Sequence, residues 1–397
     1  MRRFVLAAMV LMVLQPVTAS ASGPTCFGEV PTTVIFVGNN GYGTPGDDVI
    51  ILEGNQGISA GGGNDLICGS DGGNSIDGGA GNDKIRGAGE RDRIQGGEGN
   101  DLVRGDGAKD RLKGGPGDDV VKGGEMRDEL SGQEGDDLIY SGSGIRWGGA
   151  GTFFGDPGND VFVARLPSTL NFKAMSSPVQ IDLKAGTLSG EEIGKDRITG
   201  PIYKIVATSG DDRILGSPND EYVLPGEGRD VVELRGGDDE IFNDHDRSRD
   251  LSLLPEEDGP PNDDSFDGGS GSDSIYVHSA GRVVVNLRTG VVRSEDGIDQ
   301  IEDVENASAS DDALLIGDKA DNELMVWGGE VRGGGGNDFL WGTYGAAAVF
   351  LGGSGDDKIV GSPRGDIIDG GGGVDRLNGK GGRDACRRGE VLLNCET

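Results

Sequence analysis

The chain of 397 residues is poor in the side chains from which active sites and large globular cores are usually built. It contains only two histidines, His245 and His278, and aromatic residues make up 5% of it. The histidines lie in unrelated local sequences, and the His-Glu-x-x-His motif of zinc proteases does not occur. So few aromatic side chains favour a thin aliphatic core over a large globular one. We find no candidate catalytic residue and predict that the protein is not an enzyme.

Basic residues and long apolar runs are also scarce. Lys and Arg number 36 against 69 Asp and Glu, which argues against non-specific binding to nucleic acid. The longest apolar run, Phe4 to Leu14, is too short to span a bilayer. It follows Arg2 and Arg3 and precedes Ala19-Ser20-Ala21, an order typical of a secretory signal peptide. We therefore expect a secreted, extracellular protein without a membrane span.

Cysteine is rare too, with four residues in the whole chain. In an exported protein, four cysteines indicate two disulfides, and three pairings are possible. We favour the local pairing, Cys26 with Cys68 and Cys386 with Cys395, because it would cap both ends of a repeat array. Free buried thiols are the alternative.

Glycine, by contrast, is abundant and periodic. Nine nonapeptides of the form Gly-Gly-x-Gly-(Asn/Asp)-Asp-x-(Ile/Leu/Val)-x run without a gap over residues 60–140. The sixth position is acidic in eight of the nine repeats, with Asn74 as the exception, and the eighth is always aliphatic. Glycines at positions one, two and four permit the tight turn, and only position eight of the short strand can be buried. Two repeats make one coil of 18 residues. The predicted fold is an all-β parallel β-roll or β-helix solenoid with disulfide-capped ends and a more irregular middle.

The aspartates at position six suggest the ligand. Asp83, Asp101 and Asp119 are 18 residues apart and should line one edge of the solenoid. Carboxylates about 5 Å apart repel each other by roughly 1–3 kcal/mol per pair, so a cation should lie between them. Oxygen-only ligands on a flexible turn suit several Ca²⁺ ions better than Mg²⁺ or Zn²⁺. The predicted metal-site residues are Gly61, Gly63, Asp65, Gly79, Gly81, Asp83, Gly97, Gly99, Asp101, Gly115, Gly117, Asp119, Gly135, Asp137, Asp160, Asp273, Asp338, Asp357 and Asp375.

We call the edge lined by Asp83, Asp101 and Asp119 the first edge, and the opposite edge the second edge. The turns of the second edge differ in sequence. They lose the fourth glycine and carry Arg91, Lys109 and Arg127 at position five. We interpret these cations as built-in substitutes for calcium on that edge. At position nine, a basic stripe of Arg86, Arg104 and Lys122 is predicted on one sheet. It is a candidate contact for an anionic cell-surface polymer or polysaccharide, and simple charge balance on solvent-facing strands is the alternative.

Outside the regular block, the pattern loosens and then returns. Related motifs begin near Gly158 and Gly271, which indicates one unit present twice, and a Pro-rich acidic stretch separates them. The predicted organisation is a signal peptide (1–21), an N-terminal cap (22–59), a regular β-roll (60–147), a first degenerate unit (148–242), an acidic linker or loop (243–267), a second degenerate unit (268–345) and a C-terminal β-roll with its disulfide cap (346–397).

The nonapeptide resembles the calcium-binding repeat of RTX (haemolysin-type) proteins. The segments TCFG (Thr25–Gly28), NDLICG (Asn64–Gly69) and GRDAC (Gly382–Cys386) resemble secreted calcium-binding proteins of actinobacteria. The resemblance implies bound Ca²⁺, an extracellular structural or adhesion role and no catalytic residues. RTX toxins usually lack an N-terminal signal, so the one expected here argues against a toxin. The alternative function is a secreted hydrolase or lyase acting on polysaccharide, with an active site in the middle region.

Overall fold

The computed structural model describes residues 25–29, 41–142, 151–244, 263–279, 281–295, 297–310, 312–343 and 345–395. In these ranges, the chain forms strands β1 to β39 and no helix. They accordingly hold no helix that is long and apolar enough to cross a membrane. The expected signal peptide, residues 1–21, lies outside the described residues. The fold is a parallel β-solenoid, and the predicted all-β class and 18-residue coil are confirmed.

Two sheets run the length of the solenoid, and each coil normally gives one strand to each. The inner sheet consists of β1 (Gly41–Tyr42), β3 (Gly57–Gly62), β5 (Ser75–Ala80), β7 (Arg93–Glu98), β9 (Arg111–Pro116), β11 (Glu129–Glu134), β13 (Thr152–Phe154), β15 (Ser168–Asn171), β19 (Ile202–Val206), β21 (Tyr222–Leu224), β23 (Glu240–Asp244), β25 (Ser274–His278), β29 (Asn306–Ala309), β31 (Glu323–Val326), β33 (Phe339–Gly342), β35 (Lys358–Val360), β37 (Arg376–Asn378) and β39 (Val391–Leu393).

The outer sheet consists of β2 (Val49–Ile51), β4 (Leu66–Cys68), β6 (Lys84–Ala88), β8 (Leu102–Asp106), β10 (Val120–Gly124), β12 (Leu138–Tyr140), β14 (Val161–Val163), β16 (Val179–Asp182), β17 (Thr187–Gly190), β18 (Gly194–Thr199), β20 (Arg213–Leu215), β22 (Val231–Glu233), β24 (Ser265–Asp267), β26 (Val284–Asn286), β27 (Val291–Arg293), β28 (Ile298–Glu302), β30 (Ala313–Ile316), β32 (Gly329–Gly335), β34 (Ala348–Ser354), β36 (Ile367–Gly372) and β38 (Ala385–Arg387).

The core is a narrow aliphatic spine between the two sheets. In the outer sheet, Ile67, Ile85 and Val103 lie in register and are fully buried. In the inner sheet, Ile76 pairs with Ile94 in the same way. Because side chains alternate along a strand, the seventh and ninth positions of each repeat face away from this spine. No coil can bury its aliphatic residues alone, so the stacking of neighbouring coils stabilises the fold.

Two antiparallel meanders interrupt the outer sheet in the middle of the chain. In the first, the spatial order is β14, β18, β17, β16 and β20. In the second, the order is β24, β28, β27, β26 and β30. Opposite the meanders, the inner sheet continues directly from β15 to β19 and from β25 to β29. The two related sequence units therefore each contain the same insertion.

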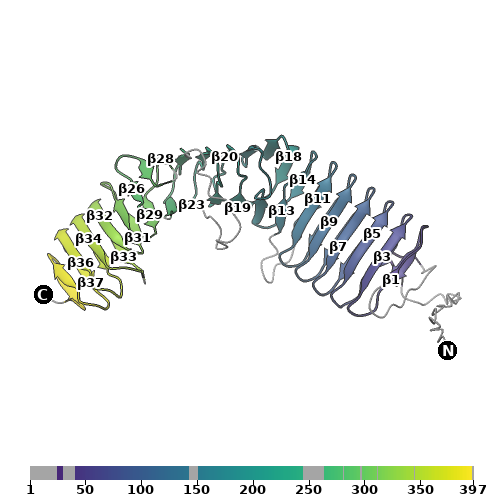
Figure 1. Ribbon diagram of the computed structural model, residues 1–397, viewed down its shortest axis with the longest axis horizontal. Coiled ribbons are helices and arrows are strands. Elements are labelled where there is room, and N and C mark those ends of the chain that lie inside the picture. Colours follow the sequence, from purple (N-terminus) through teal and green to yellow (C-terminus); the bar gives the residue numbers. More distant parts are fainter. Residues whose placement is uncertain are drawn as a thin grey trace, which may run out of the picture.

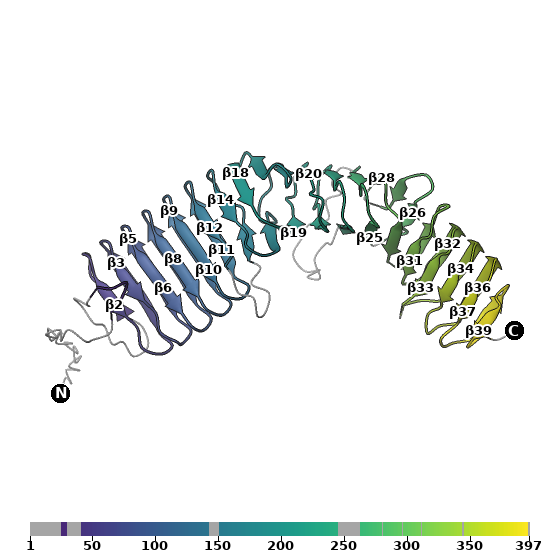
Figure 2. The same cartoon turned by 180° about the vertical axis from the view of Figure 1, so that it is seen from behind.

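These insertions explain the arch of the molecule. Each meander adds two strands to the outer sheet and none to the inner sheet. With neighbouring strands about 4.8 Å apart, one side is lengthened by roughly 10 Å at each insertion. Figures 1 and 2 show the result: at the bend, the outer-sheet strands β18, β20 and β28 lie on the convex side, and two straight arms lead away from it. The inner-sheet strands β19 and β23 lie on the concave side of the bend (Figure 1). The concave side of a solenoid is a common binding surface.

Both predicted disulfides are present. Cys26 is fully buried and bonds to Cys68 on β4, and Cys386 on β38 bonds to Cys395. The first bridge joins the leading segment to an early coil, and the second closes the last coil. Most of the predicted linker, residues 245–262, lies outside the described residues, and β24 forms the end of that range.

Candidate calcium-binding turns

The acid at position six of each turn is buried and forms a ladder along the edge of the solenoid. The backbone N–H of Asp83 donates to Oδ1 of Asp101, and that of Asp101 donates to Oδ1 of Asp119, each at 2.7 Å. These three side chains are 1–3% exposed. The ladder therefore uses one oxygen of each carboxylate and leaves the other free.

The second oxygen, Oδ2, is buried without a hydrogen-bond partner in turn after turn. A buried polar atom without a partner costs about 1–3 kcal/mol, and a carboxylate oxygen costs more. So regular a set of unpartnered oxygens fits a series of candidate cation sites better than many separate defects. The aspartates with this feature are Asp65, Asp83, Asp92, Asp101, Asp110, Asp119, Asp128, Asp137, Asp160, Asp196, Asp230, Asp239, Asp264, Asp273, Asp338, Asp357 and Asp375.

The glycines hold the turn open around this oxygen. Gly115 and Gly117, at positions two and four, have φ of +142° and +135°, a left-handed region that favours glycine. Gly114, at position one, leaves no room for a side chain, since a Cβ there would lie 2.1 Å from Oδ2 of Asp119. All the glycines that we predicted at positions two and four have positive φ: Gly61, Gly63, Gly79, Gly81, Gly97, Gly99, Gly117, Gly115 and Gly135.

Asn74 shows which oxygens surround the centre of such a turn. It replaces the aspartate at position six, and its Nδ2 donates to the carbonyls of Ser70 and Gly72, at positions two and four. The same nitrogen lies 3.5 Å from the carbonyl oxygen of Gly87 and 3.2 Å from Oδ1 of Asp92 in the next coil. An electropositive group is thus enclosed by carbonyl and carboxylate oxygens. Where aspartate stands at position six, the same set of atoms suits Ca²⁺, which prefers several oxygen ligands.

Burial also shifts the acidity of these groups. It raises the pKa of the carboxyls named in the next sentence, because the charged form loses its hydration, while the N–H bond to Oδ1 acts in the opposite direction. The raised pKa values are about 6 for Asp65, Asp83, Asp92, Asp101, Asp273 and Asp357, about 7 for Asp128, Asp137, Asp196, Asp264 and Asp338, about 8 for Asp110, Asp119, Asp160 and Asp239, and about 9 for Asp230. At neutral pH, a bound cation would favour the ionised form of these carboxyls.

A second kind of turn satisfies its own acid and needs no ion. In these closed turns, position two is Thr or Ser, and its N–H donates to the second oxygen of the acid. Thr208 donates in this way to Asp212 at 2.7 Å, and Ser362 donates to Asp366 at 2.6 Å. The hydroxyl groups bond to the same carboxylates. Closed turns therefore look like calcium turns in sequence but lack the free oxygen.

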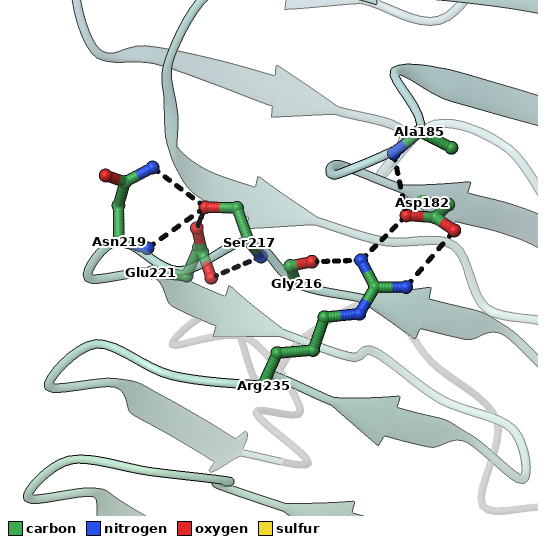
Figure 3. A network of polar contacts seen from close by, with 7 residues as sticks. All are labelled: Asp182, Ala185, Gly216, Ser217, Asn219, Glu221 and Arg235. Atoms are coloured by element: carbon green, nitrogen blue, oxygen red, sulfur yellow. Dashed lines mark hydrogen bonds and ion pairs between the residues drawn. The ribbon is translucent and has the colours of Figure 1, made fainter.

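Figure 3 shows a closed turn at the bend, in which Glu221 takes the place of the aspartate. The N–H of Ser217 donates to Glu221 at 3.0 Å, and the Ser217 hydroxyl bonds to the other carboxylate oxygen. Beside this turn, Arg235 donates to both oxygens of Asp182 at 2.8 and 3.2 Å and to the carbonyl of Gly216 at 2.7 Å. In this closed turn, the N–H and hydroxyl of Ser217 bond to both carboxylate oxygens of Glu221. In the other kind, which we call open turns, the second carboxylate oxygen has no partner.

The second edge of the N-terminal arm differs from our expectation. Lys109 pairs with Glu129 at 3.0 Å, and Arg91 and Arg127 form no ion pair with any described residue. None of the three bonds to the free oxygens of Asp92, Asp110 and Asp128. Ala108 and Met126 even adopt positive φ to keep these turns open. The contacts give no support to the idea that built-in cations replace the ion, and counting bound calcium remains its test.

The glycine-rich open turns change edges between the two arms. Those ending on Asp83 and Asp119 lead into the outer sheet, whereas those ending on Asp338, Asp357 and Asp375 lead into the inner sheet. Sequence analysis missed the open turns at Asp196, Asp230, Asp239 and Asp264, which lack the full glycine pattern. Their signal is weaker, because the glycine pattern is incomplete: Gly194 remains at position four before Asp196, for example, without a glycine at position two.

The predicted basic stripe on the outer sheet is largely neutralised. Arg86 and Arg104 both pair with Asp106, and Lys122 lies over the ring of Tyr140 at 5.3 Å. These contacts agree with the alternative of charge balance.

No arrangement of catalytic groups emerges from the described residues. They contain no group of three or more His, Cys, Asp or Glu side chains placed to hold a metal ion. Ca²⁺ would therefore depend largely on backbone carbonyls. The string Gly-Ile-Ser-Ala-Gly (Gly57–Gly61) has the spacing of a hydrolase nucleophile elbow, but it lies within β3 and no helix follows it.

Fold and turns together define a parallel β-solenoid with regularly repeated oxygen-rich, glycine-lined turns. The family model of the RTX calcium-binding nonapeptide repeat matches residues 59–94, 86–121, 113–145, 204–232, 261–278, 330–346 and 351–385. No curated protein gives a significant match. RTX calcium-binding nonapeptide repeats are therefore detected across much of the chain.

Filling one turn tests the role of its position-one glycine. In G114A, the new Cβ would meet Oδ2 of Asp119 and the carbonyl oxygen of Gly132, at 2.1 and 2.6 Å. We expect a loss of about 1–3 kcal/mol in unfolding free energy in calcium and one fewer bound ion. Calorimetric unfolding and ion counting by atomic emission would measure both. The control is G46A, because a Cβ at Gly46 has nothing within 4 Å and should change neither quantity.

Proposed function

We propose that the protein is a secreted, non-enzymatic calcium-binding scaffold that becomes rigid outside the cell. The observation that carries this proposal is the long series of buried aspartate oxygens without a partner. Extracellular calcium sites commonly have Kd values of roughly 10⁻⁴ to 10⁻³ M. Such sites would be empty before export and filled afterwards.

Two further features support an extracellular role. The chain closes both ends of the solenoid with disulfides, which persist in oxidising compartments. The arch presents a long continuous surface made of short, regular strands (Figure 1), which suits a structural or adhesion component. The alternative of a polysaccharide hydrolase or lyase is favoured by no contact among the described residues.

Calcium titration of the oxidised protein without residues 1–21 tests the proposal. We expect a cooperative gain of β-structure in circular dichroism with Ca²⁺ and a much smaller response to Mg²⁺, which keeps its waters and demands octahedral geometry. Isothermal calorimetry on the same samples would give the number of ions. Full β-structure without calcium, combined with no calorimetric binding, would refute the proposal. Incubation with polyuronates and chitin-like substrates should release no product.

A further inference from the structure

A basic groove lies on the N-terminal arm. It has a volume of about 580 Å³ and runs across the inner sheet beside the second edge. Arg91, Arg93, Lys109 and Arg111 form its basic part, and Asn55 and Asn74 are among the other residues that line it. Four cations in one groove stand out on a chain with a net charge of −33.

The repeat places these cations in two columns. Arg91 and Lys109 occupy position five of successive coils, while Arg93 and Arg111 occupy position seven and are paired in the strand register of β7 and β9. Successive members of a column are therefore about 4.8 Å apart. On the first edge, position five is Asn or Asp and bonds to the next coil, as Asn82 does to the N–H of Asn100. On the second edge, position five carries the solvent-exposed cations Arg91 and Lys109 in place of that hydrogen-bonding side chain.

Only two of these four cations form an ion pair within the described part of the protein. Glu129 binds both Lys109 and Arg111, at 3.0 and 2.5 Å. Arg91 and Arg93 are exposed and form no ion pair with any described residue. By contrast, Asp106 and Tyr140 engage the stripe on the outer sheet. The groove is thus the better candidate for binding an external anion.

The chemistry of the lining narrows the class of ligand. Guanidinium groups bind carboxylate and sulfate oxygens in a bidentate manner, and amide side chains such as that of Asn55 can bond to sugar hydroxyls. Nucleic acid carries one charge per about 1.7 Å of duplex, and the strongly acidic protein would repel it. A sparsely charged, hydroxyl-rich polymer fits the lining of the groove and would be repelled less by the surrounding negative charge of the protein.

We propose that this groove binds an acidic polysaccharide, with Arg91 and Arg93 contacting its sulfate or carboxylate groups. Glu129 holds Lys109 and Arg111 in position beside them. The site differs from the calcium turns, so it can be tested on calcium-saturated, folded protein.

Fluorescence anisotropy with labelled glycans would test the proposal at a fixed calcium and salt concentration. The probes are a lightly sulfated dextran fragment, a galacturonate oligomer, neutral dextran and single-stranded DNA. We expect binding to at least one acidic glycan and none to neutral dextran. In R91S/R93S, the affinity should fall about tenfold or more, as expected for the loss of charge-assisted contacts. The acidic glycan that binds identifies the group recognised.

Matched variants separate the groove from general charge. R86S/R104S removes the same charge from the outer sheet and should leave affinity unchanged. E129Q should strengthen binding, because it frees Lys109 and Arg111 from their shared partner. Circular dichroism and calcium binding must be unchanged in each variant that is compared. The proposal is overturned if R91S/R93S binds as well as the parent, if R86S/R104S produces the loss, if no acidic glycan binds, or if DNA binds equally well.

Discussion

Calcium-free protein should lose stability as the pH rises, and calcium-loaded protein should gain it. The cause is the set of buried aspartates whose pKa values are raised by burial, to about 6 for Asp65, about 8 for Asp119 and about 9 for Asp230. Without calcium, the folded state therefore binds more protons than the unfolded state. Stability is highest below the ordinary aspartate value of about 4 and is lost as pH passes through the raised values.

With calcium present, the dependence of stability on pH has the opposite sign, and stability rises with pH. Ions and protons compete for the same oxygens, so acidification releases calcium and removes the stabilisation that it supplies. Saturating a site at 100 times its Kd contributes about 2.7 kcal/mol, and many sites act on one solenoid. Removing calcium near pH 7.5 should therefore unfold much of the repeat array, while the disulfides remain.

Melting curves at several pH values would measure both branches. Circular dichroism should give a melting temperature that falls between about pH 5 and pH 8.5 in calcium-free buffer and rises in calcium. Protein freed of metal by dialysis avoids chelators whose own affinity depends on pH. A calcium-free melting temperature that stays constant over this window would show that the aspartates are hydrated or ionised in the folded state, contrary to their burial.

The features that could be predicted from the sequence are those set within one or two repeats. Glycine at positions two and four has a local steric cause, and Gly115 and Gly117 adopt the positive φ that was expected. Each aliphatic residue at position eight lies next to the residue 18 positions away in the neighbouring coil, so Ile67 and Ile85 stack as predicted. The disulfides followed because each joins residues of the same end of the array.

The features that were not predicted depend on contacts that the period does not encode. Whether a turn is open or closed depends on one hydroxyl residue: Thr208 satisfies Asp212, although Gly-Asp-Asp there resembles a calcium turn. The arch arises from antiparallel pairings such as β16 with β17, which no nonapeptide signals. Arg91 and Lys109 were predicted to substitute for calcium on the second edge, but they line the basic groove and form no bond to the free aspartate oxygens.

The conservative substitution D119N should stabilise the calcium-free protein and destabilise the calcium-loaded protein. In D119N, the amide keeps Oδ1, which accepts the N–H of Asp101, and exchanges the charged free oxygen for an Nδ2 donor. Asn74 shows where such a donor goes, since it bonds to the carbonyls of positions two and four. Without calcium, the variant should be more stable than the parent by about 1–3 kcal/mol, because a buried unpartnered carboxylate is removed.

In saturating calcium, D119N should instead be less stable than the parent, since one ion has lost its only charged ligand from that turn. Chemical unfolding in both conditions would give the two differences. The control is D212N in a closed turn, where both carboxylate oxygens accept bonds from Thr208. An amide there loses an acceptor, so D212N should destabilise both states equally and leave the number of bound ions unchanged. If D119N behaves like D212N, the free oxygen of Asp119 is not a calcium ligand, and the ladder along the edge is purely structural.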